Sequence, residues 1–233
     1  MKIADNIVVL DLTDERGTYH PTLVWDEHEV VLIDTGLPGQ LELISKAIAP
    51  LGFSLADITK VIITHQDHDH IGCVNELRHL GAQILAHKDE VPYLEGLKTP
   101  VRLSELEEDL KSRSESLNDG ERDYYEQVKS NAPLFYTSVD RELDDGEVLD
   151  CCGGIKVVHT PGHMPGHIVL HLLGENIIVA GDAANVLVGE FVGPNPVFTS
   201  KARMPQAQES FTKMMALEPR LVVCFHGGVH EVV

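Results

Sequence analysis

The chain has 233 residues, of which 43% are apolar and 24% charged, and 37 acidic against 18 basic residues give a net charge of −19. This length and composition are typical of a globular protein with a large buried core and argue against disorder. Such a negative surface repels phosphate backbones and anionic lipids, so we expect neither nucleic acid nor a membrane as a partner.

The first part of the chain alternates strand-like and helical patterns. Apolar runs predict strands at 6–12, 22–26, 30–36, 60–64 and 82–87, and apolar residues at helical spacing predict helices at 41–51 and 71–80. Proline and glycine end the first of these helices at Pro50 and Gly52. The second begins inside a histidine-rich segment that directly follows a buried strand.

Residues 88–147 differ from the rest, because they are highly charged and show no strand alternation. We expect a helical insertion here, with its charged residues forming a solvated helix face. A lid or pocket wall is the functional alternative, with Tyr93, Tyr124, Tyr125 and Phe135 on its apolar side.

A second group of strands follows the insertion, and a helix is expected near 205–217. The strands are predicted at 147–150, 155–160, 167–173, 176–182 and 220–226. Two groups of strands with helices between and outside them favour two packed sheets flanked by helices. No linker-like segment separates the halves, so we expect a single domain over residues 1–233.

The N-terminus and the cysteines indicate the compartment. The segment "MKIADNIVVLDLTDE" has no long apolar stretch and no cleavage site, and no apolar run approaches the roughly 18 residues of a membrane span. The four cysteines follow no disulfide or metal-binding spacing, so we expect them to be reduced. These features favour a cytoplasmic protein. They are compatible with a homo-oligomer.

Residues 64–72, "THQDHDHIG", place three histidines and two aspartates within six positions. These groups would be costly to bury without partners, and if exposed they would be an unusual end to a core strand. Metal coordination accounts for both, because imidazole and carboxylate are ordinary ligands of Zn²⁺ and similar ions. Residues two apart in an extended segment point the same way, so His65 and Asp67 can reach one ion. Asp69 and His70 can turn toward a second.

Three later segments each present a further candidate ligand at or near the end of a buried strand. "HTPGHMPGH" (159–167) contains His163 in a loop that its prolines and glycines make tight. "VAGDAAN" places Asp182 after an apolar strand, and "VVCFHGG" does the same for His226. A rigid sheet can hold such loop residues together at one edge.

These segments, with "LIDTG" before them, occur in the order found in the metallo-β-lactamase superfamily, and the sequence resembles that family from about Asp34 to His226. The resemblance implies an α+β fold, an αββα sandwich of two mixed β-sheets flanked by helices, with a metal site along one edge. It also implies hydrolysis of an ester, lactone, thioester, amide or phosphodiester with two divalent ions.

Carried over residue by residue, the resemblance assigns ligands to both ions. His65, Asp67 and His163 belong to the first ion, Asp69, His70 and His226 to the second, and Asp182 bridges the two. Asp34 matches an acid that steadies the ligands from behind, and His167 is a candidate for a similar role. Asp69 is also the expected catalytic residue, which orients the metal-bound hydroxide and accepts its proton.

The sequence departs from the family motif His-x-His-x-Asp-His at its third position, which is Asp67, with His68 directly after it. Either Asp67 replaces the usual histidine as a ligand, which the spacing from His65 favours, or His68 takes that place and Asp67 lies behind it. With Asp67, three carboxylates and a hydroxide carry −4 against +4 from two divalent ions. A neutral site is a weaker Lewis acid, and Mn²⁺ or Fe²⁺ would suit it as well as the expected Zn²⁺.

We therefore expect a dinuclear metal-dependent hydrolase that acts on a small ester, lactone or thioester. Quorum-quenching lactonases resemble the chain in size, but they carry a tyrosine where Asn185 stands. Asn185, Tyr93 and His20 are the candidate substrate contacts. The chain ends seven residues after His226, which disfavours the thioesterase glyoxalase II with its C-terminal helical domain. The alternatives are an iron-binding oxidoreductase or dioxygenase of the same fold and a non-catalytic metal-binding protein.

Overall fold

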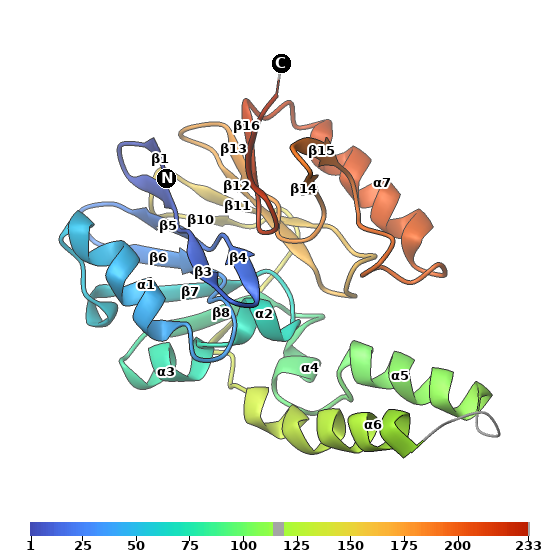
Figure 1. Cartoon of the computed structure of the whole chain (residues 1–233). Coiled ribbons are helices and arrows are strands. Elements are labelled where there is room, and N and C mark those ends of the chain that lie inside the picture. Colours follow the sequence, from blue (N-terminus) through green and yellow to red (C-terminus); the bar gives the residue numbers. More distant parts are fainter. Residues whose placement is uncertain (114–118, 233) are drawn as a thin grey trace.

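Two mixed β-sheets form the centre of the computed structural model, which describes residues 1–113 and 119–232 (Figure 1). The first sheet runs in the order β1-β2-β5-β6-β7-β8-β9. Its strands are β1 (Lys2–Ala4), β2 (Ile7–Val9), β5 (Thr22–Trp25), β6 (Val30–Ile33), β7 (Lys60–Ile63), β8 (Gln83–His87) and β9 (Arg141–Leu143). The strands from β6 to β9 pair in parallel and the others antiparallel.

The second sheet runs in the order β10-β11-β12-β13-β16-β17 and is antiparallel except where β13 pairs with β16. Its strands are β10 (Val148–Leu149), β11 (Ile155–His159), β12 (Ile168–Leu172), β13 (Ile177–Val179), β16 (Leu221–Cys224) and β17 (Gly228–Glu231). Separate hairpins are formed by β3 (Leu12–Asp14) with β4 (Gly17–Tyr19) and by β14 (Asn185–Leu187) with β15 (Glu190–Val192).

Helices flank the sheets and build an arm (Figure 1). They are α1 (Leu41–Ile48), α2 (His68–Ile71), α3 (Val74–His79), α4 (Val91–Leu94), α5 (Val101–Ser112), α6 (Asp119–Asn131) and α7 (Met204–Met215), with short 3₁₀ turns η1 (Ala49–Leu51), η2 (Leu55–Asp57) and η3 (Ala132–Phe135). None of the helices described is long and apolar enough to cross a membrane.

The apolar side chains pack in layers that define an αββα sandwich. Side chains of both sheets, such as Val31 and Val157, meet in the central core. The outer face of the first sheet packs against α1 and α3 through residues such as Ile44 and Leu77. The outer face of the second sheet packs against α7 through Met214. The expected fold class is confirmed.

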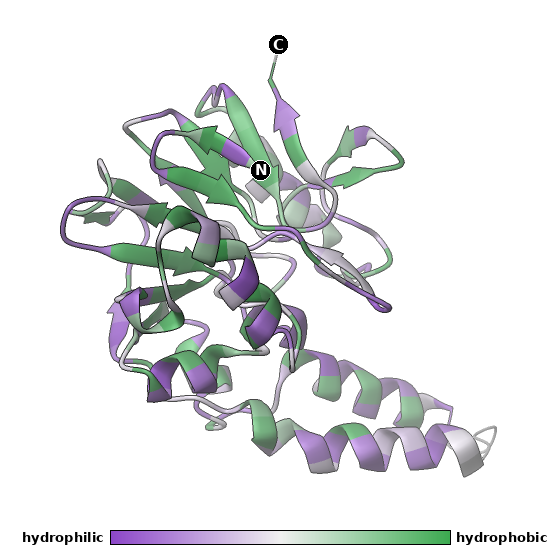
Figure 2. Cartoon of the chain, turned by 60° about the vertical axis from the view of Figure 1, so that its left-hand side comes forward, coloured by the Kyte–Doolittle hydropathy of each residue, from purple (hydrophilic) through white to green (hydrophobic). Residues whose placement is uncertain are grey.

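The charged stretch 88–147 is helical only in part. Its helices and 3₁₀ turn end at Phe135, and Arg141–Leu143 forms strand β9 at the edge of the first sheet. The expectation that 88–147 lacks strands is therefore wrong at its C-terminal end. In Figure 1, α5 and α6 lie side by side as an arm beside the sandwich, and Figure 2 shows hydrophilic and hydrophobic residues alternating along both.

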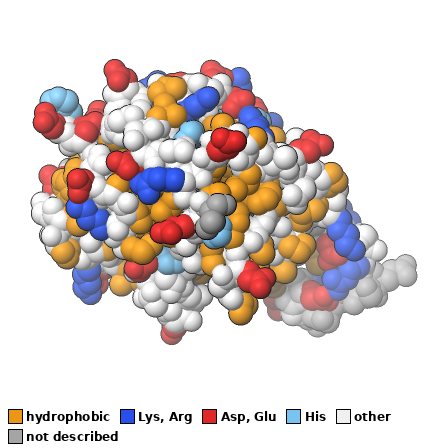
Figure 3. Space-filling view, turned by 90° about the horizontal axis from the view of Figure 1, so that it is seen from above, with side chains coloured by type: hydrophobic (Ala, Val, Ile, Leu, Met, Phe, Trp, Pro, Cys, Tyr) orange, Lys and Arg blue, Asp and Glu red, His pale blue; other side chains and the backbone are white. Residues whose placement is uncertain are grey.

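Acidic and basic side chains are dispersed over the surface. On the face in Figure 3, basic side chains (blue) stand singly or in small groups, close to acidic ones (red). This distribution is consistent with the net charge of −19 and shows no extended basic area on that face.

Candidate metal centre

The candidate ligands meet at one edge of the sandwich, where both sheets contribute. His65, Asp67, Asp69 and His70 follow β7 of the first sheet. His163, Asp182 and His226 follow β11, β13 and β16 of the second sheet. Buried apolar strands hold these chain ends in place, and the ligands are therefore positioned by the core itself.

The first group of ligand atoms lies around Asp67. Its Oδ2 is 3.2 Å from His163 Nε2 and 3.6 Å from His65 Nε2. His163 Nε2 also lies 3.3 Å from Asp182 Oδ2. These separations bring imidazole and carboxylate atoms close enough to share one cation.

The second group lies beside the first and uses the other oxygen of Asp182. Asp182 Oδ1 is 3.4 Å from His70 Nε2 and 3.3 Å from His226 Nε2. Asp69 Oδ2 is 3.3 Å from His226 Nε2 and 3.8 Å from His70 Nε2. Asp182 thus faces both groups, one oxygen to each, which is the arrangement of a bridging carboxylate.

Unpaired buried atoms test whether a metal fits here. His65 Nε2, His70 Nε2 and Asp182 Oδ1 are buried and have no hydrogen-bond partner among the described residues. Such groups are costly to leave unmatched. All three point into the ligand groups, so the donor set fits a pair of divalent cations.

Asp34 fixes His70 from behind. Its Oδ2 lies 2.8 Å from His70 Nδ1, and it also accepts hydrogen bonds from Thr64 N (2.9 Å) and Thr64 Oγ1 (2.8 Å). The backbone of Asp34 has φ 60°, a left-handed conformation that is uncommon for a non-glycine residue. By accepting the Nδ1 proton, Asp34 leaves Nε2 of His70 free for a metal.

His167 supports Asp182 in a similar way. The backbone N–H of Asp182 donates to His167 Nε2 at 3.1 Å, and His167 Nδ1 lies 2.9 Å from Thr160 Oγ1. Burial holds the pKa of His167 well below its usual range, so the ring is neutral and can accept this bond. His167 therefore lies behind the ligands, where the sequence placed it as a candidate.

The loop that carries His163 packs closely against α7. Gly162 has φ 130°, and a Cβ there would lie 2.2 Å from the backbone nitrogen of Ala207. Arg203 donates to the carbonyl oxygen of His163 and pairs with Glu105 of α5 at 2.6 Å. Thr199 Oγ1 lies 3.2 Å from His163 Nδ1. His163 is thus held both through its ring and through its backbone carbonyl group.

The site is strongly acidic. Burial alone would lower the pKa of His226, but the carboxylates of Asp182 and Asp69 outweigh it and raise that pKa to about 9. Three carboxylates gathered this closely favour cations of any kind. The pKa shift thus points the same way as the ligand geometry.

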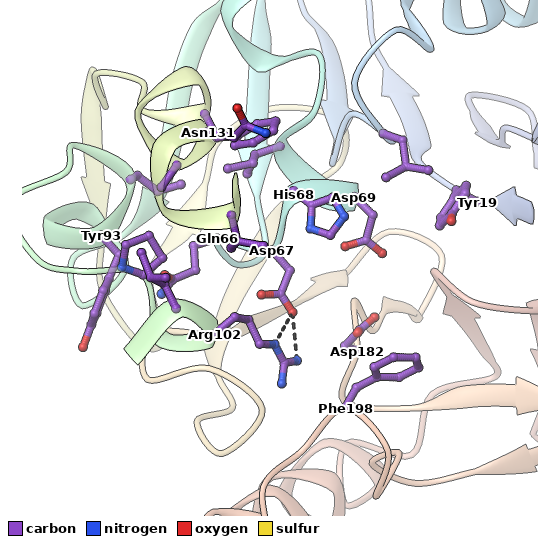
Figure 4. A pocket seen from close by; sticks show the side chains of 18 of the residues that line it. Tyr19, Gln66, Asp67, His68, Asp69, Tyr93, Arg102, Asn131, Asp182 and Phe198 are labelled. Atoms are coloured by element: carbon purple, nitrogen blue, oxygen red, sulfur yellow. Dashed lines mark hydrogen bonds and ion pairs between the residues drawn. The ribbon is translucent and has the colours of Figure 1, made fainter. Parts of the chain in front are cut away.

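Arg102 contributes a cation that the sequence did not reveal. It lies in α5, and its Nη2 is 2.9 Å from Asp67 Oδ2 (Figure 4). The same nitrogen is 3.3 Å from His163 Nε2. It stands in a charged helix, where the sequence pattern indicates a solvated surface. Its one sequence signal is its place just after Pro100, at the start of the helix.

Glu90 is a second residue that the sequence did not reveal. Its carboxylate is fully buried and accepts hydrogen bonds from Gln66 N (3.0 Å), Gln66 Nε2 (3.1 Å) and Gly166 N (2.7 Å). It therefore ties the segment between His65 and Asp67 to the loop after His163. Burial raises the pKa of Glu90 to about 8. Nothing in the sequence marks this glutamate among its charged neighbours.

The other candidate site residues differ in whether they lie near the ligand groups or the cavity. His68 is exposed, with its ring 6.3 Å from that of Phe135, whereas Asp67 Oδ2 lies 3.2 Å from His163 Nε2, so the geometry favours Asp67. Tyr93 lines the cavity described below. Asn185 is buried, with Nδ2 donating to Gly193 O, and His20 Nδ1 lies 3.0 Å from Asp11 Oδ1. Neither is among the described residues that line the cavity.

A further group of potential ligands, His87, Asp89 and His159, has a different geometry. The two rings are stacked, with centroids 4.1 Å apart and planes at 11°. His159 Nε2 lies 2.9 Å from the carbonyl oxygen of Pro165 and therefore donates to it. That nitrogen is not available to a metal, and parallel rings direct their nitrogens side by side instead of toward a common point.

Comparisons with known proteins give matches over most of the chain. A family model described as "Metallo-beta-lactamase superfamily" matches residues 16–226. The chain is 32% identical to "Probable metallo-hydrolase YflN" of Bacillus subtilis (strain 168), over 91% of this chain and 80% of that protein. It is 25% identical to "Hydroxyacylglutathione hydrolase GloC" of Haemophilus influenzae, over 69% of this chain and 64% of that protein.

Solved structures show the same fold. A crystal structure of a metallo-beta-lactamase family protein from Thermus thermophilus matches with a TM-score of 0.78 at 23% identity. The match covers 99% of this chain and 76% of that one.

Proposed function

The chain belongs to the metallo-β-lactamase superfamily, and on that premise we propose that it is a dinuclear metal-dependent hydrolase of small esters, lactones or thioesters. The observation that carries the proposal is the double set of ligand atoms around Asp182, one group on each of its oxygens. The buried, unpaired nitrogens of His65 and His70 support it, because they have the chemistry of metal ligands.

The residues divide between two cations. His65, Asp67 and His163 would hold one, Asp69, His70 and His226 the other, and Asp182 both. Zn²⁺ suits this mixture of imidazole and carboxylate, and the three carboxylates also suit Mn²⁺ or Fe²⁺. When bound, such a pair of cations lowers the pKa of a coordinated water and polarises the substrate carbonyl.

The protein's own groups orient the reactants. Asp69 lines the cavity beside His226, where its carboxylate can orient the attacking water and take its proton. Asp34 and His167 keep His70 and Asp182 in place through the hydrogen bonds described above. Arg102 pairs with Asp67 at 2.9 Å and so holds that carboxylate at the edge of the ligand groups.

The test combines metal content with turnover. Untagged protein is analysed by mass spectrometry for bound metals and assayed on a panel of esters, lactones, thioesters and phosphodiesters. We expect about two divalent ions per chain and turnover of carbonyl substrates, with Asp69→Ala and His163→Ala each lowering kcat/KM by at least about a hundredfold. His28→Ala, at an exposed turn, is the matched control and should retain full activity. Turnover that survives both site substitutions would rule the proposal out.

A further inference from the structure

A large cavity opens over the ligand groups, and residues of α4, α5, α6 and η3 form one part of its wall. Its volume is about 810 Å³, and His226 is among the residues that line it. Asp67, Asp69 and Asp182 line it close to one another (Figure 4). Pockets for small molecules commonly measure about 300–1,000 Å³. The cavity is therefore large enough for a substrate that extends well beyond the reacting carbonyl.

Away from the ligands the wall is apolar. Leu94 of α4 and Leu103 of α5 line it and are almost completely buried, at 1% and 5% exposure. Val128 of α6 and Ala132 and Phe135 of η3 continue the wall and are half-buried. Three of the four aromatic residues expected on an apolar side of the insertion, Tyr93, Tyr124 and Phe135, line it, whereas Tyr125 donates to Glu107 at 2.7 Å.

The charged groups of the cavity are already paired. Among the described residues that line it, the basic side chains apart from histidine are Arg16 and Arg102. Arg16 Nη2 lies 2.6 Å from Asp14 Oδ2, and Arg102 Nη2 lies 2.9 Å from Asp67 Oδ2. A phosphate or carboxylate on a distant part of the substrate would thus find no unpaired lysine or arginine among these residues. It would also be repelled by a protein of net charge −19.

We propose that the substrate is an uncharged ester, lactone or thioester whose alkyl or aryl group lies along α4, α6 and η3. This inference rests on the proposed hydrolase function and narrows it. Substrate binding becomes more favourable when an alkyl chain displaces water from the apolar wall. The binding free energy improves with each buried methylene. The candidate metal ligands at one end of the cavity would carry out hydrolysis. The wall formed by α4, α6 and η3 would select substrates by their alkyl or aryl group.

The first experiment varies the chain alone. Metal-loaded full-length protein is assayed with p-nitrophenyl esters and with γ-alkyl lactones whose chains grow from two to ten carbons. We expect kcat/KM to rise about threefold to fourfold per methylene until the wall is covered. A second comparison tests the effect of charge with coenzyme A and N-acetylcysteamine thioesters of the same acyl group. The kcat/KM for the uncharged N-acetylcysteamine thioester should be at least tenfold higher.

The second experiment changes the wall. Ala132→Trp fills the space beside Phe135, so the ratio of kcat/KM for octanoyl to acetyl ester should fall at least tenfold. Leu134→Trp is the matched control, because Leu134 belongs to the same 3₁₀ turn, is 70% exposed and does not line the cavity. That variant should keep the wild-type ratio. Val128→Asp provides a second variant, and it should lower the same ratio by placing a carboxylate in the apolar wall.

The outcomes separate the two levels of inference. If no ester, lactone or thioester is turned over by metal-loaded protein, the proposed function itself fails. If they are turned over with no dependence on chain length, or with the phosphate-bearing thioester preferred, the narrower inference is overturned and the hydrolase stands. An Ala132→Trp variant with an unchanged chain-length ratio would also overturn it.

Discussion

Asp67 and Arg102 act as one charged unit at the rim of the candidate metal centre. If two divalent cations and a hydroxide were bound, the three carboxylates Asp67, Asp69 and Asp182 would leave the candidate site neutral. The guanidinium of Arg102, 2.9 Å from Asp67 Oδ2, would give such a site a net positive charge. The aspartate that departs from the family motif and the arginine on the helical arm therefore compensate each other.

A double-mutant cycle tests this pairing. Asp67→His alone should weaken binding of one of two cations, because Arg102 loses its carboxylate and repels the ion. Asp67→His with Arg102→Met should recover much of that loss. We expect a coupling free energy of about 0.5–3 kcal/mol, measured by titration of each variant against a chromophoric chelator. Effects that add to within about 0.3 kcal/mol would show that the two residues act independently.

Glu90 connects three elements that carry the site. Its carboxylate binds Gln66 and Gly166, and Gln66 Oε1 in turn accepts a hydrogen bond from Val101 N, at the start of α5. The ligand segment after β7, the loop after β11 and the helix that carries Arg102 are thus linked through one buried acid. The position of the arm and the geometry of the ligands are coupled through this chain of contacts.

The pH dependence of stability tests the state of Glu90. Its pKa is about 8 in the folded protein against an ordinary value of 4.5, because burial disfavours the charged form. Between these values the folded state holds a proton that the unfolded state has released, so this residue's contribution to stability falls as pH rises from 4.5 to 8. The slope reaches at most about 1.4 kcal/mol per pH unit.

Glu90→Gln removes this titration. We expect a constant loss of stability from the mismatched amide, and a gain relative to wild type as pH rises from about 5 to 8. Urea unfolding at each pH gives both quantities. Glu27→Gln, at an exposed position, is the control and should follow the wild-type slope. Parallel slopes for Glu90→Gln and wild type would show that the carboxyl group is ionised throughout this range.

At the scale of elements, the sequence predicts those strands that carry a local pattern of apolar residues. Strands with long apolar runs, such as β7, β13 and β16, lie where expected, and the candidate ligands after them could be named because each lies within a few residues of its strand end. The short hairpins β3–β4 and β14–β15 and the edge strand β9 were missed. They have three residues each, with mixed polarity and no strand-like alternation, and β9 in addition pairs with β8, which is distant in sequence. Arg102 and Glu90 were missed for the same reason, since their partners lie 24 to 76 residues away.

The whole molecule is divided into two sheets that meet at the ligands. The first sheet supplies His65, Asp67, Asp69 and His70, and the second supplies His163, Asp182 and His226. Bound cations would therefore join the two halves of the sandwich. They would also neutralise three carboxylates in a chain that already carries a net charge of −19.

Metal removal should accordingly destabilise the entire fold. Binding at about a thousand times Kd stabilises a protein by about 4 kcal/mol, which corresponds to about 8–16 °C in Tm for a chain of this size. We expect chelation to lower Tm by about this amount and two equivalents of Zn²⁺ or Mn²⁺ to restore it, measured by differential scanning calorimetry with metal content checked in each sample. Asp182→Asn provides the decisive comparison. It weakens the carboxylate that faces both ligand groups, so chelation should shift its Tm far less than that of wild type or of His28→Ala. A wild-type Tm that stays constant after complete metal removal would mean that the two sheets are held together by their apolar core alone.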